Sequence, residues 1–423
     1  MNKSNYWQKT INKPEFKQEN LPENTEILVI GAGFTGLSAA YTLARQNIRV
    51  VVLEENSVGW GASSRNGGMV LTGMKLGVET LIKKYGIERA RRMFALSLDA
   101  LNNVETLVQE EKINCSFARC GHFEAAWKPA HFDGYSRSAE LLEKDFNHKV
   151  KIISRTHQRQ EIGSDMYYGG MLDEKSAGIN PAQFVFGLSA AADRQGVKMM
   201  ENTMALGVEK YAGGYQVNTS RGKIKAQKII FGTSGYSGTV FPYLQKRIAP
   251  IGSYIIATSP LPAELVKELI PNNRMIFDSK HYLYYFRITP DNRMLFGGRA
   301  VFKSETPSAI EQSAPILRKS MLEVFPGLRE FPVEYVWGGS LDFAVDSMPH
   351  TGHVDGLYYS IGYAGHGAAF AVQLGKMVAD KAIGKDVDDP LDQLPFLKFP
   401  FNFGKSGYMP LAGLYYKILD LIS

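Results

Sequence analysis

Residues 26–54 follow an order that few folds can accommodate: an apolar segment, a glycine-rich turn, a helix-favouring segment, a second apolar segment and an acid. The two apolar segments are Ile27–Ile30 and Ile48–Leu53, and the acid is Glu54. Short uninterrupted apolar runs are typical of strands buried in a parallel sheet. We therefore expect a strand–helix–strand unit with parallel strands near the start of the chain.

The turn, residues 31–36, matches the pattern G-x-G-x-x-G. In a dinucleotide site the first glycine permits the tight turn, the second lets the backbone approach a pyrophosphate, and the third lets helix and strand pack closely. The helix N-terminus offers N–H groups to the phosphates, and an acid about 20 residues on binds ribose hydroxyls. A purely structural turn is the alternative, and the pattern does not separate FAD from NAD. The predicted contacts are Gly31, Gly33, Phe34, Thr35, Gly36, Glu54 and Glu55.

Two further glycine-rich segments suit the same ligand. Residues 59–68 follow the acid directly: their serines and arginine can donate to a pyrophosphate, and their last glycines let backbone lie against a flat ring. An exposed loop is the alternative for this segment, and an ordinary strand–loop junction is the alternative for residues 229–235. The predicted contacts are Ala62, Ser63, Ser64, Arg65, Asn66, Gly67, Gly68, Thr233 and Gly235.

A third segment, near the C-terminus, has the same order of strand, glycine-rich turn and helix as the first. Leu357–Ile361 is an apolar strand, a glycine-rich turn follows, and Ala368–Ile383 reads as a helix. Its N-terminus can stabilise negative charge, such as that on a reduced flavin. His366 is either catalytic or a structural donor within the turn. The predicted contacts are Gly365, His366 and Gly367.

Together these segments resemble the FAD-dependent oxidoreductases of the D-amino-acid oxidase superfamily, and within it the gamma-glutamylputrescine oxidoreductase-like proteins. The resemblance covers nearly the whole chain, from about residue 5 to residue 385 and plausibly beyond. It also includes Tyr6-Trp7, Tyr284–Arg299, Trp337–Gly339, Asp346–Pro349 and Ala412–Tyr416.

The resemblance implies a mixed α/β (α+β two-domain) fold: a discontinuous Rossmann-like FAD-binding domain and a substrate domain built on an antiparallel sheet. The FAD domain would comprise residues 1–78, 180–245 and 337–385. The substrate domain would comprise residues 79–179 and 246–336, and residues 386–423 would form a tail with a docking helix. Val208 would contact adenine through its backbone, and Gly338 would also contact the cofactor.

The activity implied is oxidation of the C–N bond of an amine or amino acid by hydride transfer to flavin N5, with oxygen as acceptor. A quinone- or carrier-linked dehydrogenase and a non-catalytic FAD-binding scaffold protein are the alternatives. Arg287 is the predicted anchor for a substrate carboxylate, because its planar guanidinium can bind one bidentately. Tyr254, Tyr284 and Tyr285 are expected to line the pocket, although aromatic residues in strands are usually core. The 63–68 loop contains neither His nor Cys, so non-covalent FAD is expected.

Composition limits the partners and the cellular location that can be expected. The 423 residues carry a formal charge of +6 without a basic run, so no nucleic-acid partner is expected. The two cysteines supply no zinc site, and the first 25 residues lack the apolar core of a signal peptide, so a cytoplasmic location is expected. A helix starting at Pro410 is expected to dock on the protein rather than on a membrane surface. The oligomeric state stays open.

Overall fold

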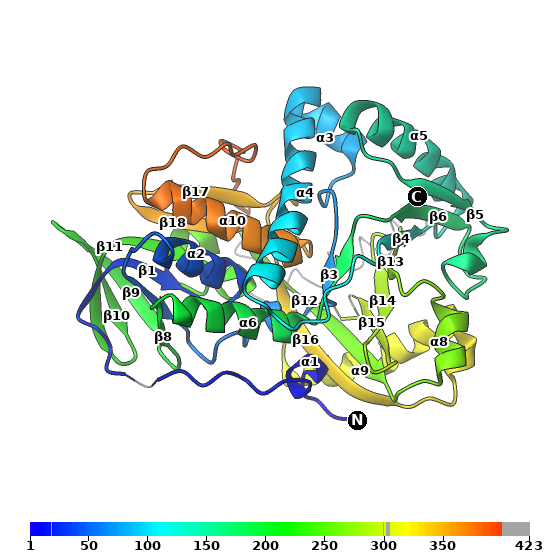
Figure 1. Cartoon of the computed structure of the whole chain (residues 1–423), viewed down its shortest axis with the longest axis horizontal. Coiled ribbons are helices and arrows are strands. Elements are labelled where there is room, and N and C mark those ends of the chain that lie inside the picture. Colours follow the sequence, from blue (N-terminus) through cyan, green and yellow to red (C-terminus); the bar gives the residue numbers. More distant parts are fainter. Residues whose placement is uncertain (18, 299, 302–304, 400–423) are drawn as a thin grey trace.

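The computed structural model describes residues 1–17, 19–298, 300–301 and 305–399. Two large sheets dominate it and lie side by side (Figure 1). The helix predicted from Pro410 lies outside the described residues. The helices run from α1 to α10: Tyr6–Lys9, Phe34–Ala44, Val78–Tyr85, Ile87–Glu110, Pro129–Phe146, Pro181–Arg194, Pro242–Gln245, Ala263–Leu269, Pro307–Val324 and Gly367–Ala382.

The first sheet has the order β17-β18-β11-β1-β2-β8, in which β18 to β8 are parallel and β17 is antiparallel to β18, and the antiparallel strands β9 and β10 extend it beside β11. β1 pairs in parallel with both β2 and β11, as the opening sequence pattern predicts. The strands of this sheet are β1 (Asn24–Ile30), β2 (Val50–Leu53), β8 (Lys198–Met200), β9 (Ala205–Tyr211), β10 (Gly214–Thr219), β11 (Gly222–Phe231), β17 (His350–Val354) and β18 (Leu357–Ile361).

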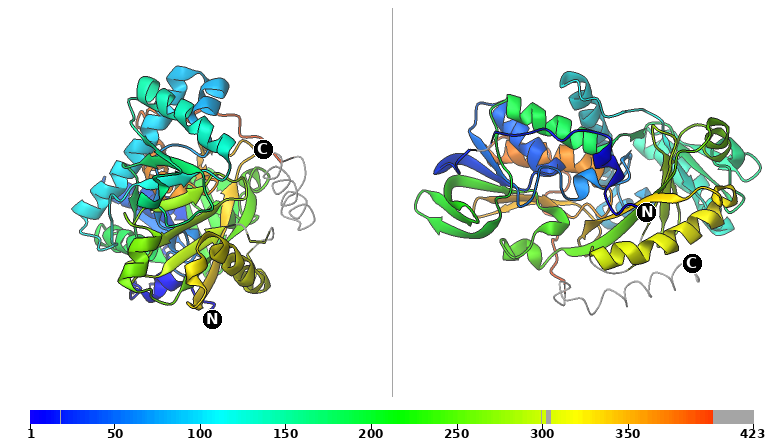
Figure 2. Two further views of the ribbon diagram at one scale, coloured as in Figure 1. Left: turned by 90° about the vertical axis from the view of Figure 1, so that its right-hand side faces the viewer. Right: turned by 90° about the horizontal axis from the view of Figure 1, so that it is seen from below.

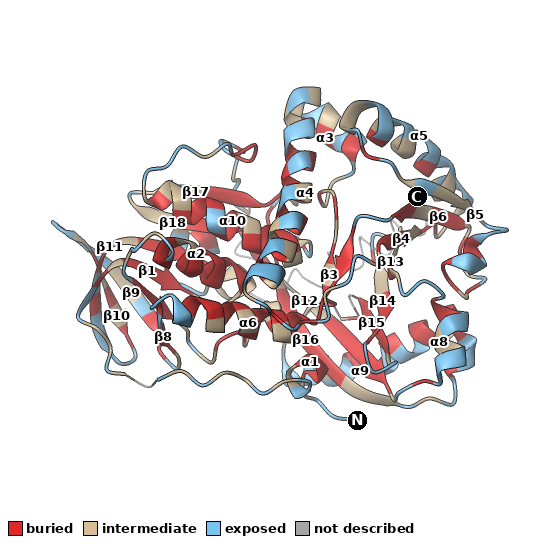
Figure 3. Ribbon diagram, viewed as in Figure 1, coloured by how far each residue is buried: buried red, intermediate tan, exposed pale blue. Residues whose placement is uncertain are grey.

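Both faces of this sheet are buried, which explains its uninterrupted apolar strands. In β1, which is largely buried (Figure 3), Ile27 and Val29 belong to the core shared with α2, α6 and α10, whereas Leu28 and Ile30 belong to the core on the opposite face, shared with β10. α10 crosses α2 so closely that a Cβ on Gly375 would lie 2.4 Å from the carbonyl oxygen of Thr35. The middle of α10 therefore packs against the N-terminal turn of α2.

The second sheet is antiparallel except for the pair β13–β4, and its order is β16-β12-β15-β14-β13-β4-β6-β5. α9 packs on the β12, β15 and β16 side of it (Figure 2). Its strands are β4 (His122–Ala125), β5 (Lys151–Ser154), β6 (Gly169–Asp173), β12 (Ala249–Thr258), β13 (Met275–Asp278), β14 (Tyr284–Ile288), β15 (Met294–Gly298) and β16 (Val333–Phe343). A small third sheet pairs β3 (Met69–Val70) with β7 (Ala177–Gly178).

The pairing of the strands shows which residues lie on each face of the second sheet. Residues that face each other across neighbouring strands point to the same side, and successive residues alternate. One row of partners is fully apolar and forms the core beneath α9: Ile256, Phe296, Phe286, Ile276, Phe123 and Leu172. The adjacent row therefore points to the opposite side: Ile255, Gly297, Tyr285, Phe277, Glu124 and Met171.

The mixed α/β fold expected from the sequence, with a parallel sheet beside a largely antiparallel one, is confirmed. The first sheet takes its strands from three separate stretches of chain. The domain boundaries themselves stay a prediction.

Candidate active site

A cavity of about 750 Å³ extends from the N-terminus of α2 to the second sheet. Most of the predicted cofactor contacts line it: Gly31, Gly33, Phe34, Thr35, Glu54, Glu55, Ala62, Ser63, Arg65, Asn66, Gly67, Thr233, Gly365, His366 and Gly367. The structure thus brings together residues from four glycine-rich segments that extend from Gly31 to Gly367 in the sequence.

The glycine-rich turn before α2 has the geometry that its sequence predicts. Gly31 adopts φ +102°, a region that favours glycine, and a Cβ on Gly36 would lie 1.9 Å from the Gly31 carbonyl oxygen. The turn therefore needs its first glycine for conformation and its third for packing. The backbone N–H of Phe34, in the first turn of α2, donates to Ser63 Oγ at 2.9 Å, which ties the 62–68 loop to the helix start.

Glu54 is fixed beside this turn. Its two carboxylate oxygens accept the backbone N–H groups of Ala32 at 2.9 Å and Asn56 at 3.0 Å. Burial raises its pKa, although these two hydrogen bonds act in the opposite direction. The carboxylate keeps lone pairs that can accept further hydrogen bonds from a ligand.

The turn before α10 forms a second helix N-terminus on the cavity. Asp342 of β16 accepts the backbone N–H groups of Gly362 at 2.8 Å and Tyr363 at 3.2 Å, and burial raises its pKa to about 6. The Tyr363 hydroxyl lies 2.7 Å from Thr35 Oγ1 and so joins the α10 turn to the start of α2. Sequence reasoning missed Asp342, although an acid shortly after the Trp337–Gly339 segment was a usable signal.

His366 is the N-cap residue of α10, and its side chain lines the cavity. Its Nδ1 atom is buried without a hydrogen-bond partner in the described part of the chain. Burial, followed by the nearby charges of Lys75 and His122, lowers the pKa of the imidazole to about 3. The ring is therefore neutral near pH 7 and has an unsatisfied polar atom available to a ligand. Whether it is catalytic stays a prediction.

Hydrogen bonds from the N-terminal segment fix the backbone of the 62–68 loop. Asn5 Nδ2 donates to the Ser64 carbonyl at 2.7 Å, and Trp7 Nε1 donates to the Asn66 carbonyl at 3.0 Å. The Ser64 side chain is fully buried, accepts Gln8 Nε2 at 2.8 Å and does not line the cavity. This corrects the expectation that Ser64 donates to a pyrophosphate, because its hydroxyl faces away from the cavity.

Arg65 lines the cavity, but its guanidinium already has partners. It forms an ion pair with Glu305 and donates to the carbonyl of Gly338 at 3.2 Å. It also stacks on Trp60, with its central carbon 4.4 Å from the ring centroid. Donation by Arg65 to a phosphate therefore stays a prediction.

Arg287 does not face the cavity, which corrects the prediction that it anchors a substrate carboxylate. It is 4% exposed, and its Nη1 donates to the carbonyls of Ile179 at 2.9 Å and Gly68 at 3.1 Å. Burial lowers its pKa to about 10. The side chain thus supports the backbone of the 67–68 turn from behind.

The tyrosines divide between the two faces of the second sheet. Tyr254 and Tyr284 share the face of the α9 core, so the prediction that they line the pocket is corrected. Successive residues of a strand point to opposite faces of the sheet, and the sequence of a single strand does not show which face α9 covers. Tyr285 points the other way and lines the cavity, with its ring so close to Gly67 that a Cβ there would lie 3.0 Å from it.

Several predicted cofactor contacts lie just outside the cavity wall. Residues 203–206 line the cavity and Val208 lies further along β9, so its contact with adenine stays a prediction. The others serve packing instead: Gly36 against Gly31, Gly68 beneath Arg287, Gly235 against Ser340 and Gly338 against Tyr254.

The end of the cavity on the second sheet contains ionisable residues that sequence reasoning missed. Two of its carboxylates are paired: Asp173 Oδ2 lies 2.6 Å from His148 Nε2, and Asp278 Oδ2 lies 3.0 Å from Lys280 Nζ. The pKa of Asp278 is raised to about 6, since burial outweighs its lysine partner. The other polar residues of this wall include His122, Glu124, Tyr135, Ser279 and Lys75. Their sequence signal was weak, because each is an isolated polar residue in an ordinary element.

These features fit FAD. The first-turn backbone of α2 and Ser63 suit its pyrophosphate, and Glu54 suits a ribose. Gly67, Tyr285 and the N-terminus of α10 suit a flat ring system that gains negative charge on reduction. The orphaned Nδ1 of His366 lies on this same stretch of wall.

Comparison with known proteins agrees with this geometry. The model of the DAO family, described as FAD dependent oxidoreductase, matches residues 26–381. The "Probable oxidoreductase OrdL" of Haemophilus influenzae is 32% identical over 94% of this chain and 92% of the relative. The gamma-glutamylputrescine oxidoreductase of Escherichia coli K12 is 29% identical over 99% of this chain and 98% of the relative.

Solved structures show the same fold. Glycine oxidase from Geobacillus kaustophilus superposes with a TM-score of 0.75 at 16% identity, over 90% of this chain and 100% of that one. L-amino acid deaminase from Proteus vulgaris gives a TM-score of 0.73 at 19% identity, over 92% of this chain and 100% of that one. Within the described residues, none of the helices combines the length and apolarity needed to span a bilayer.

Proposed function

The chain belongs to the DAO family of FAD-dependent oxidoreductases, and from that premise we propose that it oxidises a carbon–nitrogen bond of an amine or amino acid. One observation carries the proposal: a single continuous cavity is lined both by the dinucleotide turn of α2 and by Tyr285, Phe277 and Glu124 of the second sheet. A cofactor lying along the first part leaves the second part for an organic substrate. The related gamma-glutamylputrescine oxidoreductase supports an amine as that substrate.

When bound, FAD would supply a hydride acceptor for the substrate carbon, and with loss of a proton from the nitrogen the substrate C–N bond would become C=N. The protein must therefore hold the amine in its neutral form. Near His366, burial and the charge of Lys75 disfavour a further positive charge, as the lowered pKa of His366 shows. The same environment would lower the pKa of a substrate amine placed beside the ring. Water can then hydrolyse the C=N bond to a carbonyl compound and an amine.

We propose oxygen as the electron acceptor, FAD held without a covalent bond, and action in the cytoplasm. The first rests on resemblance to amine oxidases. The second is supported by the absence of His and Cys from residues 63–68, and the third is the expectation drawn from the sequence. The carboxylate anchor that Arg287 was expected to provide is not part of the proposal.

The test is an absorbance spectrum of the purified protein before and after anaerobic addition of gamma-glutamylputrescine, followed by amino acids and N-methyl amino acids. Bleaching of the flavin bands by one of these compounds is the expected result and identifies the substrate class. Readmitted air should restore the bands and yield peroxide. If a quinone restores the flavin bands but air does not, the electron acceptor is a quinone rather than oxygen. If no amine bleaches the flavin bands, the proposal of amine oxidation is contradicted.

A further inference from the structure

Glu124 differs from the other acids at the sheet end of the cavity. Asp173 lies beside His148 and Asp278 beside Lys280, whereas no Lys, Arg or His among the described residues lies within 4 Å of the Glu124 carboxylate. Burial raises the pKa of Glu124 and Asp278 adds to this, whereas the Tyr135 hydroxyl and the more distant charge of Lys75 act in the opposite direction without outweighing it. The cavity wall thus holds one carboxylate whose charge is incompletely compensated.

A second polar group faces the same space. Tyr135 of α5 lines the cavity and is 7% exposed, and its hydroxyl has no hydrogen-bond partner in the part of the chain that the structure describes. The hydroxyl also lies close enough to the Glu124 carboxylate and to Ser279 for weak side-chain interactions with both, but neither contact has the geometry of a full hydrogen bond. A buried hydroxyl without a partner is costly, and a ligand that hydrogen-bonds to it removes this cost. A carboxylate beside it favours a ligand group that is both positively charged and a donor, which describes an ammonium group.

The strand register places this pair at a defined distance from Tyr285. Tyr285 faces Phe277 on the next strand, and Phe277 faces Glu124 on the strand after it. Neighbouring strands lie about 4.8 Å apart, so Glu124 lies about 10 Å along the sheet from Tyr285. The wall between and around them is apolar, with Phe277, Met171 and Leu142, which suits a chain of methylene groups.

We propose that Glu124 and Tyr135 form a subsite for a distal ammonium group, and that the substrate is a long-chain amine carrying this second cation about 10 Å from the nitrogen that is oxidised. The inference rests on the proposed function and adds the substrate class. Small α-amino acids are too short to reach both ends. Glu124 and Tyr135 determine specificity and take no part in the oxidation itself.

The experiment compares three linear amines of matched length: 1,7-diaminoheptane, heptylamine and 8-aminooctanoate. Their dissociation constants are measured with the FAD-loaded protein from perturbation of the flavin spectrum, and reduction rates are measured anaerobically. Wild-type protein should bind the diamine at least about tenfold more tightly than the other two, since hydrogen bonds to charged groups have this magnitude.

Glu124→Gln should weaken diamine binding about 10- to 100-fold and leave heptylamine binding and the saturating reduction rate within about threefold. Tyr135→Phe should weaken diamine binding by several-fold. Glu174→Gln, which alters an exposed acid paired with Lys151, is the matched control and should change nothing. Thermal unfolding of each variant verifies that the protein is folded.

Equal binding of diamine and heptylamine, or no change in Glu124→Gln, would overturn the subsite while leaving amine oxidation intact. Tighter binding of 8-aminooctanoate would overturn it as well and would assign the site to an anion. If the diamine binds but no amine of any length bleaches the flavin, the proposed function fails instead. The binding and bleaching measurements therefore separate the two failures.

Discussion

The imidazole of His366 cannot act as a titrating group near neutral pH. Burial lowers its pKa to about 3, so the ring is neutral at every pH above that value. We therefore expect kcat/KM of wild type and His366→Gln to show the same pH dependence between pH 5 and 9. The variant should be slower by up to about tenfold, since it loses at most one hydrogen bond to substrate. An acidic limb near pH 6 or 7 in wild type that vanishes in the variant would contradict this.

Glu54 and Glu55 are adjacent acids that line the same cavity but differ in their surroundings. Glu54 is half-buried and held by two backbone N–H groups, whereas Glu55 is exposed. Glu54→Gln should raise the dissociation constant of FAD about tenfold or more, because a charged hydrogen-bond acceptor is lost. Glu55→Gln should change it by less than about threefold, because solvent screens an exposed charge.

Titration of apoprotein with FAD, followed by flavin fluorescence, measures both constants. Urea unfolding of the two apoproteins serves as the control, since Glu54→Gln also removes acceptors from the turn. Equal effects of the two substitutions would show that Glu54 does not hold the ribose.

Among the elements, the packing of α2 on β1 depends on Gly36. A Cβ at this position would lie 1.9 Å from the Gly31 carbonyl oxygen, and backbone cannot move aside as a side chain can. Gly36→Ala should therefore destabilise the protein by about 3 kcal/mol or more and abolish FAD binding. Gly134→Ala is the matched control: Gly134 is exposed in α5 with nothing within 4 Å, so the change should stabilise by about 0.5–1 kcal/mol. Urea unfolding distinguishes the two, and a Gly36→Ala protein as stable as wild type would refute the packing argument.

The sequence predicts elements better than it predicts which way their residues face. The strand–turn–helix unit around Gly31 and Gly36 could be identified because its signals are local: a short apolar run, glycines and a helix start. The facing of Tyr254, Tyr284 and Tyr285 could not, because it depends on how four strands pair and on where α9 packs. Glu124 was missed for the same reason.

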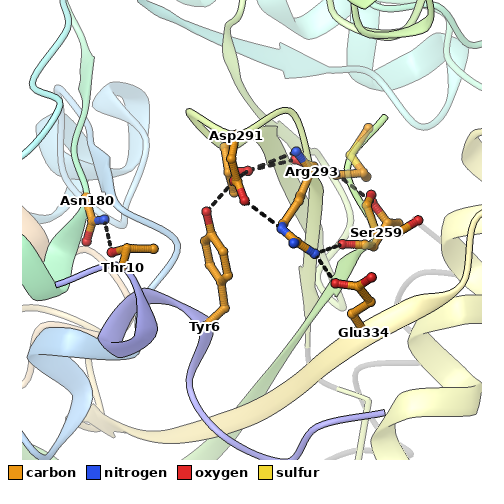
Figure 4. A network of polar contacts seen from close by, with 10 residues as sticks. Tyr6, Thr10, Asn180, Ser259, Asp291, Arg293 and Glu334 are labelled. Carbon is orange, nitrogen blue, oxygen red and sulfur yellow. Dashed lines mark hydrogen bonds and ion pairs between the residues drawn. The ribbon is translucent and has the colours of Figure 1, made fainter. Parts of the chain in front are cut away.

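The N-terminal segment joins parts of the molecule that are distant in sequence. Asn2 pairs with β16 through the backbone of Glu334 and Val336, and the Tyr6 hydroxyl donates to Asp291 on the second sheet (Figure 4). Trp7 is fully buried and donates to the 62–68 loop. The segment thus connects the second sheet with the loop that is expected to contact FAD.

Two conservative substitutions in this segment separate its effects on stability and on cofactor binding. Trp7→Phe keeps an aromatic ring but leaves the Asn66 carbonyl without its donor, which should cost about 1–3 kcal/mol and loosen the loop. FAD affinity should fall several-fold. Tyr6→Phe removes only the contact with Asp291, so it should lower the free energy of unfolding by a similar amount and leave FAD affinity unchanged. Urea unfolding and FAD titration of both apoproteins give the two quantities. If Tyr6→Phe weakens FAD binding as much as Trp7→Phe does, the segment acts on the cofactor site through the second sheet rather than through the loop.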